Sequence, residues 1–245
     1  MFAGLRILAV VPARGGSKGL PRKNLRLMNG VPLVALAGQT IQKVAAIDRA
    51  VVSTDDPEIA DAAKQVGLHF NGSRPEALSG DRVPDQPVLL HELQVAERAD
   101  GTKYDIVVML QPTSPLRKHE HVQQTIEMLV EGSFDAVWTV SRTDLKFHPL
   151  KQLRVIHGRL EYYLKEGGQI VARQQLDQVY HRNGVAYAIR RQCLVEQQSI
   201  KGSRTGALVI DDELVNIDSA EDLARADSLL SSRSARPAEP ENRHE

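Results

Sequence analysis

Cysteine is almost absent from the sequence, and so are long apolar runs and any excess of one charge. The single cysteine, Cys193, excludes an internal disulfide and a zinc site built on several cysteines. No apolar run approaches the roughly 20 residues of a membrane span, and the amino end lacks the pattern of a signal peptide. Lys plus Arg and Asp plus Glu each number 31, which argues against a nucleic-acid binder. These absences favour a cytoplasmic enzyme or binding protein with no membrane or nucleic-acid partner.

The charges are unevenly placed although their totals balance. The first 47 residues hold seven bases and no acid, whereas 205–224 hold six acids and no base. If the two segments meet in the folded chain, they supply a cationic wall and an acidic pole to one site.

Apolar runs alternate with stretches of helical spacing along most of the chain. Strands are predicted at 7–11, 49–54, 67–70, 105–110, 136–140, 184–190 and 207–211, with a short extended stretch at 214–217. Helices are predicted at 32–46, 57–66, 88–98, 119–130 and from 219 to about 230. The alternation predicts an α/β fold with a mostly parallel sheet and right-handed crossovers.

The alternation weakens between residues 142 and 181. Strand-like pieces at 152–156 and 161–164 are separated by His-Gly and Glu-Gly-Gly turns, a pattern typical of hairpins. We interpret 142–181 as an inserted β-rich subdomain that serves dimerisation. The main domain then comprises 1–141 and 182–230, and the polar stretch 231–245 is predicted to be a disordered tail.

The segment 12–24, PARGGSKGLPRKN, directly follows the first predicted strand. Its three glycines allow close approach of a ligand to the backbone, and its four bases, Arg14, Lys18, Arg22 and Lys23, attract anions. It matches neither the P-loop nor the dinucleotide-binding pattern. A surface turn with solvated bases is the alternative, but the position after a strand and the lack of acids favour phosphate binding.

A second segment, 111–117 (QPTSPLR), also follows an apolar strand. Its amide, hydroxyl and guanidinium groups suit a ligand pocket at the end of that strand. Taken alone, it is better interpreted as an ordinary strand-to-helix loop in which Thr113 or Ser114 satisfies local backbone groups.

The third segment, 215–222, places Asn216 and Asp218 on the same side of an extended stretch. Such a pair can offer oxygen atoms to Mg²⁺ alongside substrate phosphates. Asp218 followed three residues later by Glu221 also has the spacing of a helix capping box. The spacing leaves both uses open.

A fourth group lies around Arg173–Gln175 and 180–187, where cations and amides can bind the carboxylate and hydroxyls of an acidic sugar. A polar hairpin face is the simpler interpretation of these residues. His148 and His181 are not assigned as bases, because an isolated histidine is more often structural.

Taken together, the motifs identify a family. PARGGSKGLPRKN, RPEAL (74–78), LQPTSPLR, HPLK (148–151), RQQL, RNGVAY and NIDSAEDL occur in this order. As a set they resemble the CMP-N-acylneuraminate synthetases, the cytidylyltransferases that activate sialic acids. The resemblance spans nearly all of 6–229. It implies a Rossmann-like nucleotidyltransferase fold, a homodimer with an exchanged β-rich arm, Mg²⁺ as cofactor, and transfer of CMP from CTP to a nine-carbon 2-keto acid sugar.

The resemblance also implies roles for individual residues. Triphosphate and nucleotide contacts fall on Arg14, Gly15, Ser17, Lys18, Lys23 and Asn24, with Lys23 and Arg14 as catalytic cations and Arg74 reading the cytosine. Sugar contacts fall on Gln111, Arg173 and Tyr187, with Arg173 facing the carboxylate, and metal ligation falls on Asp218 and Asn216.

Two positions depart from the family pattern. Asn216 stands where the family has the first aspartate of an Asp-Ile-Asp motif, and an amide oxygen contributes no charge to a metal. His181-Arg182 stands where the sialic acid enzymes often have Arg-Pro, which leaves open which residue contacts the sugar. Legionaminic acid, pseudaminic acid and Kdo remain alternative substrates, and a nucleotide-binding protein without turnover is the third possibility.

Overall fold

The computed structural model describes residues 1–234, so most of the predicted tail lies outside the described residues. Residues 231–234 are described, and they continue the last helix, α6 (Ala220–Ser234). The predicted boundary at 231 was therefore too early. Within the described part of the chain no helix is both long and apolar enough to cross a membrane.

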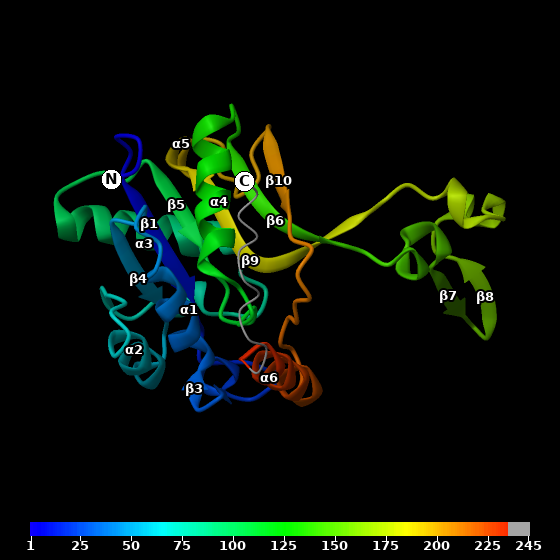
Figure 1. Ribbon diagram of the computed structural model, residues 1–245, viewed down its shortest axis with the longest axis horizontal. Helices are drawn as coiled ribbons and strands as arrows, with labels where there is room; N and C mark the ends of the chain where they lie inside the picture. The colour runs from blue at the N-terminus through cyan, green and yellow to red at the C-terminus, as the bar shows by residue number, and fades with distance from the viewer. Residues whose placement is uncertain (235–245) are drawn as a thin grey trace, which may run out of the picture.

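A six-stranded sheet forms the centre of the molecule (Figure 1). Its strands, in order across the sheet, are β10 (Thr205–Val209), β6 (Ala136–Arg142), β9 (Tyr180–Arg190), β5 (Ile106–Met109), β1 (Ile7–Pro12) and β4 (Arg49–Ser53). Only β9 runs antiparallel to its neighbours, while β1 pairs in parallel with β4 and β5, and β10 with β6. The predicted mostly parallel α/β fold is confirmed.

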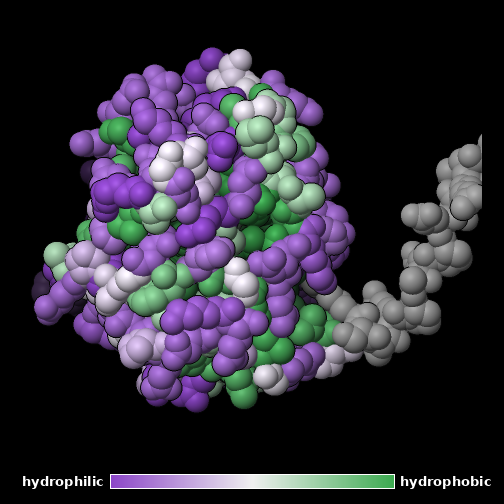
Figure 2. All heavy atoms as spheres, turned by 90° about the vertical axis from the view of Figure 1, so that its left-hand side faces the viewer, coloured by the Kyte–Doolittle hydropathy of each residue, from purple (hydrophilic) through white to green (hydrophobic). Residues whose placement is uncertain are grey.

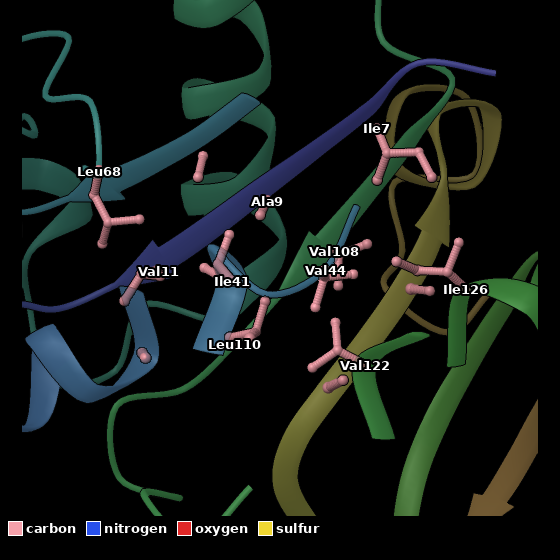
Figure 3. Packing of buried hydrophobic residues seen from close by; sticks show 14 of the residues in the cluster. Ile7, Ala9, Val11, Ile41, Val44, Leu68, Val108, Leu110, Val122 and Ile126 are labelled. Atoms are coloured by element: carbon pink, nitrogen blue, oxygen red, sulfur yellow. The ribbon is translucent and has the colours of Figure 1, made fainter. Parts of the chain in front are cut away.

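The adjacent strands β1 and β5 are apolar throughout, and helices cover both faces of the sheet there. Ile7, Ala9 and Val11 point to a face covered by α1 (Leu33–Ile41), α2 (Pro57–Lys64) and α4 (His119–Glu131), as the side chains in Figure 3 show. Leu8 and Val10 point to the other face, under α3 (Asp85–Asp100) and α5 (Arg191–Val195). This two-sided burial explains why continuous apolar runs predicted the strands correctly.

Two predicted elements lose the largest part of their predicted length. The helix at 32–46 ends at Ile41, and turns closed by Lys43 N–H to the Thr40 carbonyl and Val44 N–H to the Ile41 carbonyl follow it. The strand at 67–70 is reduced to a single bridge between Val51 and His69.

Small elements complete the body next to the first loop. These are η1 (Lys23–Leu25), β2 (Leu27–Met28), β3 (Val31–Pro32) and η2 (Glu76–Leu78). β2 and β3 pair as a hairpin, and α6 packs beside it through a cluster that includes Met28, Leu33 and Ala226. This packing brings the acidic segment 205–224 close to the cationic loop at 12–24.

An arm leaves the body between the end of β6 and the start of β9 and extends away from it (Figure 1). It contains one hairpin, β7 (Leu153–Ile156) and β8 (Arg159–Tyr162), joined by His157 and Gly158 with φ of 49° and 76°. The rest of its regular structure consists of short 3-10 helices, η3 (Leu145–Phe147), η4 (Pro149–Lys151), η5 (Lys165–Gln169) and η6 (Arg173–Gln175). The arm is therefore less β-rich than the turns in its sequence indicate.

Candidate nucleotide-binding cavity

A cavity of about 490 Å³ opens where β1 and β5 end. Ligands of open α/β sheets bind at this edge because neighbouring loops diverge from it. The predicted residues that line the cavity are Arg14, Ser17, Lys18, Lys23, Asn24, Arg74, Gln111, Asn216 and Asp218. Segments that are far apart in the sequence therefore share one wall.

The loop after β1 is braced by its own polar groups. The Asn24 side-chain amide donates to the Arg14 carbonyl at 2.9 Å, and the Lys23 N–H donates to Ser17 Oγ at 3.2 Å. Arg22 adopts a left-handed conformation with φ of 55°, which starts the η1 turn. Four predicted contact residues, Arg14, Ser17, Lys23 and Asn24, thus also hold the shape of the loop.

Glycines in the loop are needed for close packing against acidic segments. A Cβ on Gly19 would lie 2.9 Å from the Asp218 carbonyl oxygen, and one on Gly15 would lie 2.9 Å from Asp56 Cβ. The Gly15 N–H donates to Asp55 Oδ1 at 2.9 Å, and Gly15 does not line the cavity. Gly15 therefore serves loop packing in this structure.

Lys23 and Asp218 meet in the cavity with 2.8 Å between Nζ and Oδ1. The capping box that the spacing of Asp218 and Glu221 left open does not form. Ser219 and Asp222 cap α6 instead, since the Ser219 N–H and Oγ both bond to Asp222 Oδ2 at 2.9 Å and the Asp222 N–H returns to Ser219 Oγ at 3.2 Å. This arrangement releases the Asp218 carboxylate from helix capping and leaves it in the cavity.

Residues 214–217 form no strand, but the predicted alternation holds. Val215 and Ile217 are buried, while Asn216 and Asp218 line the cavity. A bond from the Ile217 N–H to the Thr113 carbonyl, 2.8 Å long, ties this segment to the loop after β5.

Arg74 forms a buried cationic part of the cavity wall and is only 5% exposed. Its nearest described acid is Asp55, with 3.8 Å between Nη2 and Oδ1, and its Nε and Nη2 have no hydrogen-bond partner among the described residues. Burial lowers the pKa of Arg74 from its usual value. Buried donors without partners carry a free-energy cost, which a ligand with acceptor atoms can offset.

Glu92 lies beside Arg74 and was not predicted from the sequence. It is 1% exposed, and burial raises its pKa to about 7 even though Ser53 and the Arg74 cation act in the opposite direction. The available signal was an acid within the apolar stripe of α3, next to Leu89 and Leu93.

Asp81 was also missed, although it lines the cavity. Its Oδ1 lies 2.9 Å from Arg14 Nη2, and its Oδ2 lies 2.5 Å from Lys18 Nζ. These contacts hold the pKa of the Asp81 carboxyl below its usual range, with the Lys18 hydrogen bond as the main cause. Asp81 is six residues beyond the RP of the RPEAL motif, in a loop that has no regular pattern.

The segments 111–117 and 180–187 are joined by hydrogen bonds next to Gln111. Arg117, fully buried, donates to the carbonyls of Gln111 and of Gly184, the latter at 3.1 Å, and burial lowers its pKa to about 9. Ser114 Oγ donates to the Asn183 carbonyl at 2.6 Å. Ser114 therefore satisfies a distant backbone group and not the local one.

Gly184 is required at this junction. It has φ of 72°, and a Cβ there would lie 2.5 Å from Ser114 Oγ and 2.7 Å from Gln111 Oε1. Because residue 184 has no side chain, the side chain of Gln111 can pack against its backbone at the cavity wall.

Tyr187 and Arg173 do not line the cavity. Tyr187 is 1% exposed, and its hydroxyl accepts from the Gly184 N–H and from Arg182 Nε, each at 3.2 Å. Arg173 lies in the arm, where it lines a separate hollow of about 250 Å³ with Leu150 and Leu176. Within one chain, only Gln111 of the three predicted sugar contacts reaches the cavity.

His181 and Arg182, which replace the Arg-Pro of the family pattern, have different surroundings. His181 Nδ1 lies 2.9 Å from Thr143 Oγ at the root of the arm. Arg182 stacks on the rings of Trp138 and Tyr187, at 4.7 and 4.8 Å from their centroids. Its Nη2 lies 3.2 Å from Asp85 Oδ2, and Asp85 lines the cavity, so Arg182 is the nearer of the two to this site.

The oxygen atoms of Asn216 and Asp218 suit a metal ion that is also bound to the phosphates of a nucleotide. No group of three or more His, Cys, Asp or Glu among residues 1–234 could hold a metal ion by itself. Asn216 and Asp218 offer one amide and one carboxylate oxygen to the cavity. Mg²⁺ is commonly held by one or two carboxylates together with substrate phosphates, and this pair fits that arrangement.

Comparison with known proteins agrees with this geometry. The sequence profile of the cytidylyltransferases matches residues 8–234. The chain belongs to the cytidylyltransferase family. Among curated cytidylyltransferases it is 32% identical over 229 residues to the CMP-N,N'-diacetyllegionaminic acid synthase of Legionella pneumophila, covering 92% of this chain and 97% of that protein. It is 26% identical over 227 residues to the pseudaminic acid cytidylyltransferase of Campylobacter jejuni, covering 92% and 96%.

Solved structures share the cytidylyltransferase fold of this chain. CMP:2-keto-3-deoxy-manno-octonic acid synthetase, solved in complex with CTP, superposes with a TM-score of 0.68 at 18% identity, over 93% of this chain and 99% of that one. At this identity the likeness establishes the fold.

Proposed function

We propose that this cytidylyltransferase transfers CMP from CTP to a 2-keto acid sugar and releases pyrophosphate. The observation that carries the proposal is the single cavity in which Arg14, Lys18, Lys23 and Arg74 face Asn216 and Asp218. The anomeric hydroxyl oxygen attacks the α-phosphorus, the bond to the β-phosphate oxygen breaks, and the hydroxyl proton passes to solvent. No protein base is assigned.

The cations divide into two roles. Arg14 and Lys18 suit the β- and γ-phosphates, and Lys23 suits the negative charge that grows on the leaving pyrophosphate. The unpartnered donors of Arg74 suit the carbonyl oxygen and ring nitrogen of cytosine. Positioning and charge stabilisation then account for most of the catalysis.

Mg²⁺ is the proposed cofactor, held by Asp218 and Asn216 together with the triphosphate. When bound, it would supply a Lewis acid that offsets phosphate charge. The Lys23–Asp218 pair supports this placement, because Lys23 has a new anionic partner in the nucleotide when Asp218 turns to the metal.

The acceptor is proposed to be a nine-carbon acid sugar of the sialic acid type. The relatives named for legionaminic acid and pseudaminic acid support these two sugars as alternatives within that class. Kdo, an eight-carbon 2-keto acid sugar, is the further alternative. CTP is a cytoplasmic nucleotide, so we place the reaction in the cytoplasm.

A homodimer is proposed to complete the acceptor side. Among the described residues, most of the exposed large hydrophobic side chains belong to the arm, including Val155 at 70% and Val171 at 90% exposure. Isolated, such a surface is unfavourable in water, and a second copy can cover it. Arg173 can then contact the sugar carboxylate from the partner subunit.

A pyrophosphate-release assay with CTP, Mg²⁺ and a panel of acid sugars tests the proposal. We expect turnover with at least one nine-carbon sugar and little with other nucleoside triphosphates. Pyrophosphate release with none of the eight- and nine-carbon sugars would contradict it. The second candidate, a nucleotide-binding protein without turnover, is favoured only by Asn216, and full turnover at millimolar Mg²⁺ would dismiss it.

A further inference from the structure

Each cation of the loop at 12–24 is already paired with a carboxylate. Arg22 pairs with Glu58 at 2.7 Å and Lys23 pairs with Asp218 at 2.8 Å. The remaining two, Arg14 and Lys18, share Asp81. Three acids from three distant segments therefore neutralise one cationic loop.

Asp81 differs from the other two acids. Glu58 faces a surface hollow outside the cavity, and Asp218 is the proposed metal ligand. Asp81 lies in the cavity and holds one oxygen against a guanidinium and the other against an ammonium. Two adjacent phosphate oxygens would be recognised by the same two groups in the same way. The carboxylate thus occupies the place that the proposed function gives to the triphosphate.

The loop that carries Asp81 can move, so that its ion pairs separate. Asp81 lies in the loop between η2 and α3, where the described backbone bonds include the 3.3 Å contact of the Val83 N–H with the Gly80 carbonyl. The Asp81 side chain is 33% exposed and that of Lys18 is 86% exposed, so water can solvate both groups when they separate. Pairs of this exposure are weak and exchange readily.

We propose that Asp81 is a positioning residue that acts as an internal substitute for phosphate. It holds Arg14 and Lys18 together before CTP binds, yields them to the triphosphate, and takes them back as pyrophosphate leaves. Asp81 competes with both ligands for the same cations. It therefore weakens the binding of CTP and pyrophosphate, and it speeds pyrophosphate release. The inference rests on the proposed function for the identity of the anion.

The test compares Asp81→Asn with a matched control, Glu58→Gln. Both substitutions remove a carboxylate that neutralises the same loop, but only Asp81 lies in the cavity. We expect Asp81→Asn to lower the Kd for CTP and the Kd for pyrophosphate by a similar factor, about three- to tenfold, because exposed pairs are worth up to about fivefold each. Asp81→Glu should restore both constants towards wild type. Glu58→Gln should leave them within about twofold.

Binding is measured without acid sugar, by titration of CTP and of pyrophosphate at low and moderate salt, together with thermal unfolding of each variant. Unchanged or weaker binding in a folded Asp81→Asn protein would overturn the proposal, and equal shifts in both variants would show only a general charge effect. If Asp81→Asn does not fold, Asp81→Ser removes the same carboxylate with the same expectation. Failure of wild-type protein to bind CTP would instead contradict the proposed function.

Discussion

The cavity takes its side chains from one folded body, whereas the arm leaves its apolar side chains in water. Leu8 and Met109, in the sheet beneath the cavity, are fully buried, but every residue of β7 and β8 is exposed. The face of the body opposite the arm is covered mainly by hydrophilic residues (Figure 2). Under the proposed function, a single chain supplies the nucleotide side of the site, and the proposed second copy would cover the exposed side chains of the arm.

The difference separates two kinds of site residue. Lys23, Arg74 and Asp218 are held by contacts within one chain, so their effects should not depend on assembly. Arg173 lies in the arm and lines none of that cavity, so its effect should depend on a second copy.

Replacing Lys23 with Met should have the largest effect. We expect kcat to fall about 10²- to 10³-fold, because one preorganised charge is removed from the developing pyrophosphate. Pyrophosphate release measures it. Arg22→Met is the matched control, since Arg22 is the adjacent cation but lies outside the cavity, and it should change kcat less than threefold. A similar loss in both variants would mean that Lys23 has no special role.

Glu92→Gln should change how the stability of the body depends on pH. Burial raises the pKa of Glu92 to about 7, above its usual value, so the folded chain keeps a proton that the unfolded chain has lost. The wild-type free energy of unfolding should therefore fall as pH rises from about 4.5 to 7, by about 2 to 3 kcal/mol. Gln removes this pH-dependent contribution, so the free energy of unfolding of the variant should increase relative to that of wild type as pH rises. Denaturant unfolding at pH 5, 6.5 and 8 measures the difference, and parallel pH profiles would contradict it.

Mixing two impaired variants, assayed at an acid-sugar concentration below the wild-type KM, should test whether the arm crosses to a second copy. Arg173→Gln should raise the KM for the acid sugar about tenfold, the loss of one charge-assisted pair, and leave the KM for CTP unchanged. If subunits exchange and the site is shared, mixing Arg173→Gln with Lys23→Met restores about a quarter of wild-type activity, because half of the dimers are mixed and each has one intact site. Activity equal to the mean of the separate variants, with subunit exchange demonstrated, would mean that Arg173 does not act from a second copy.

Adding a negative charge at residue 216 and removing one at residue 218 should change the Mg²⁺ requirement in opposite directions. Asn216→Asp should lower the Mg²⁺ concentration for half-maximal turnover severalfold, because a carboxylate binds Mg²⁺ better than an amide does. Asp218→Asn should raise it. Metal titrations of pyrophosphate release measure both, and an unchanged Mg²⁺ requirement in the two variants would refute the placement of the metal at Asn216 and Asp218.

Much of the body could be predicted because its strands are buried on both faces. Residues 7–11 and 106–110 are apolar throughout, and these runs became β1 and β5. The short elements failed where neighbours decide the outcome. Residues 67–70 pair at one point only, and the arm folds largely as 3-10 turns.

Sequence patterns were enough to predict the family, the order of the strands along the chain, and the polar loops that follow them. These features depend on residue type and local spacing, which a linear pattern contains. The tertiary structure alone decided which charges meet: Lys23 with Asp218 across 195 residues, and Asp81 with Arg14 and Lys18. It also placed the Tyr187 hydroxyl against Gly184 and carried Arg173 out into the arm. Pairing and burial depend on distances through space, and those distances exist only after the sheet has assembled.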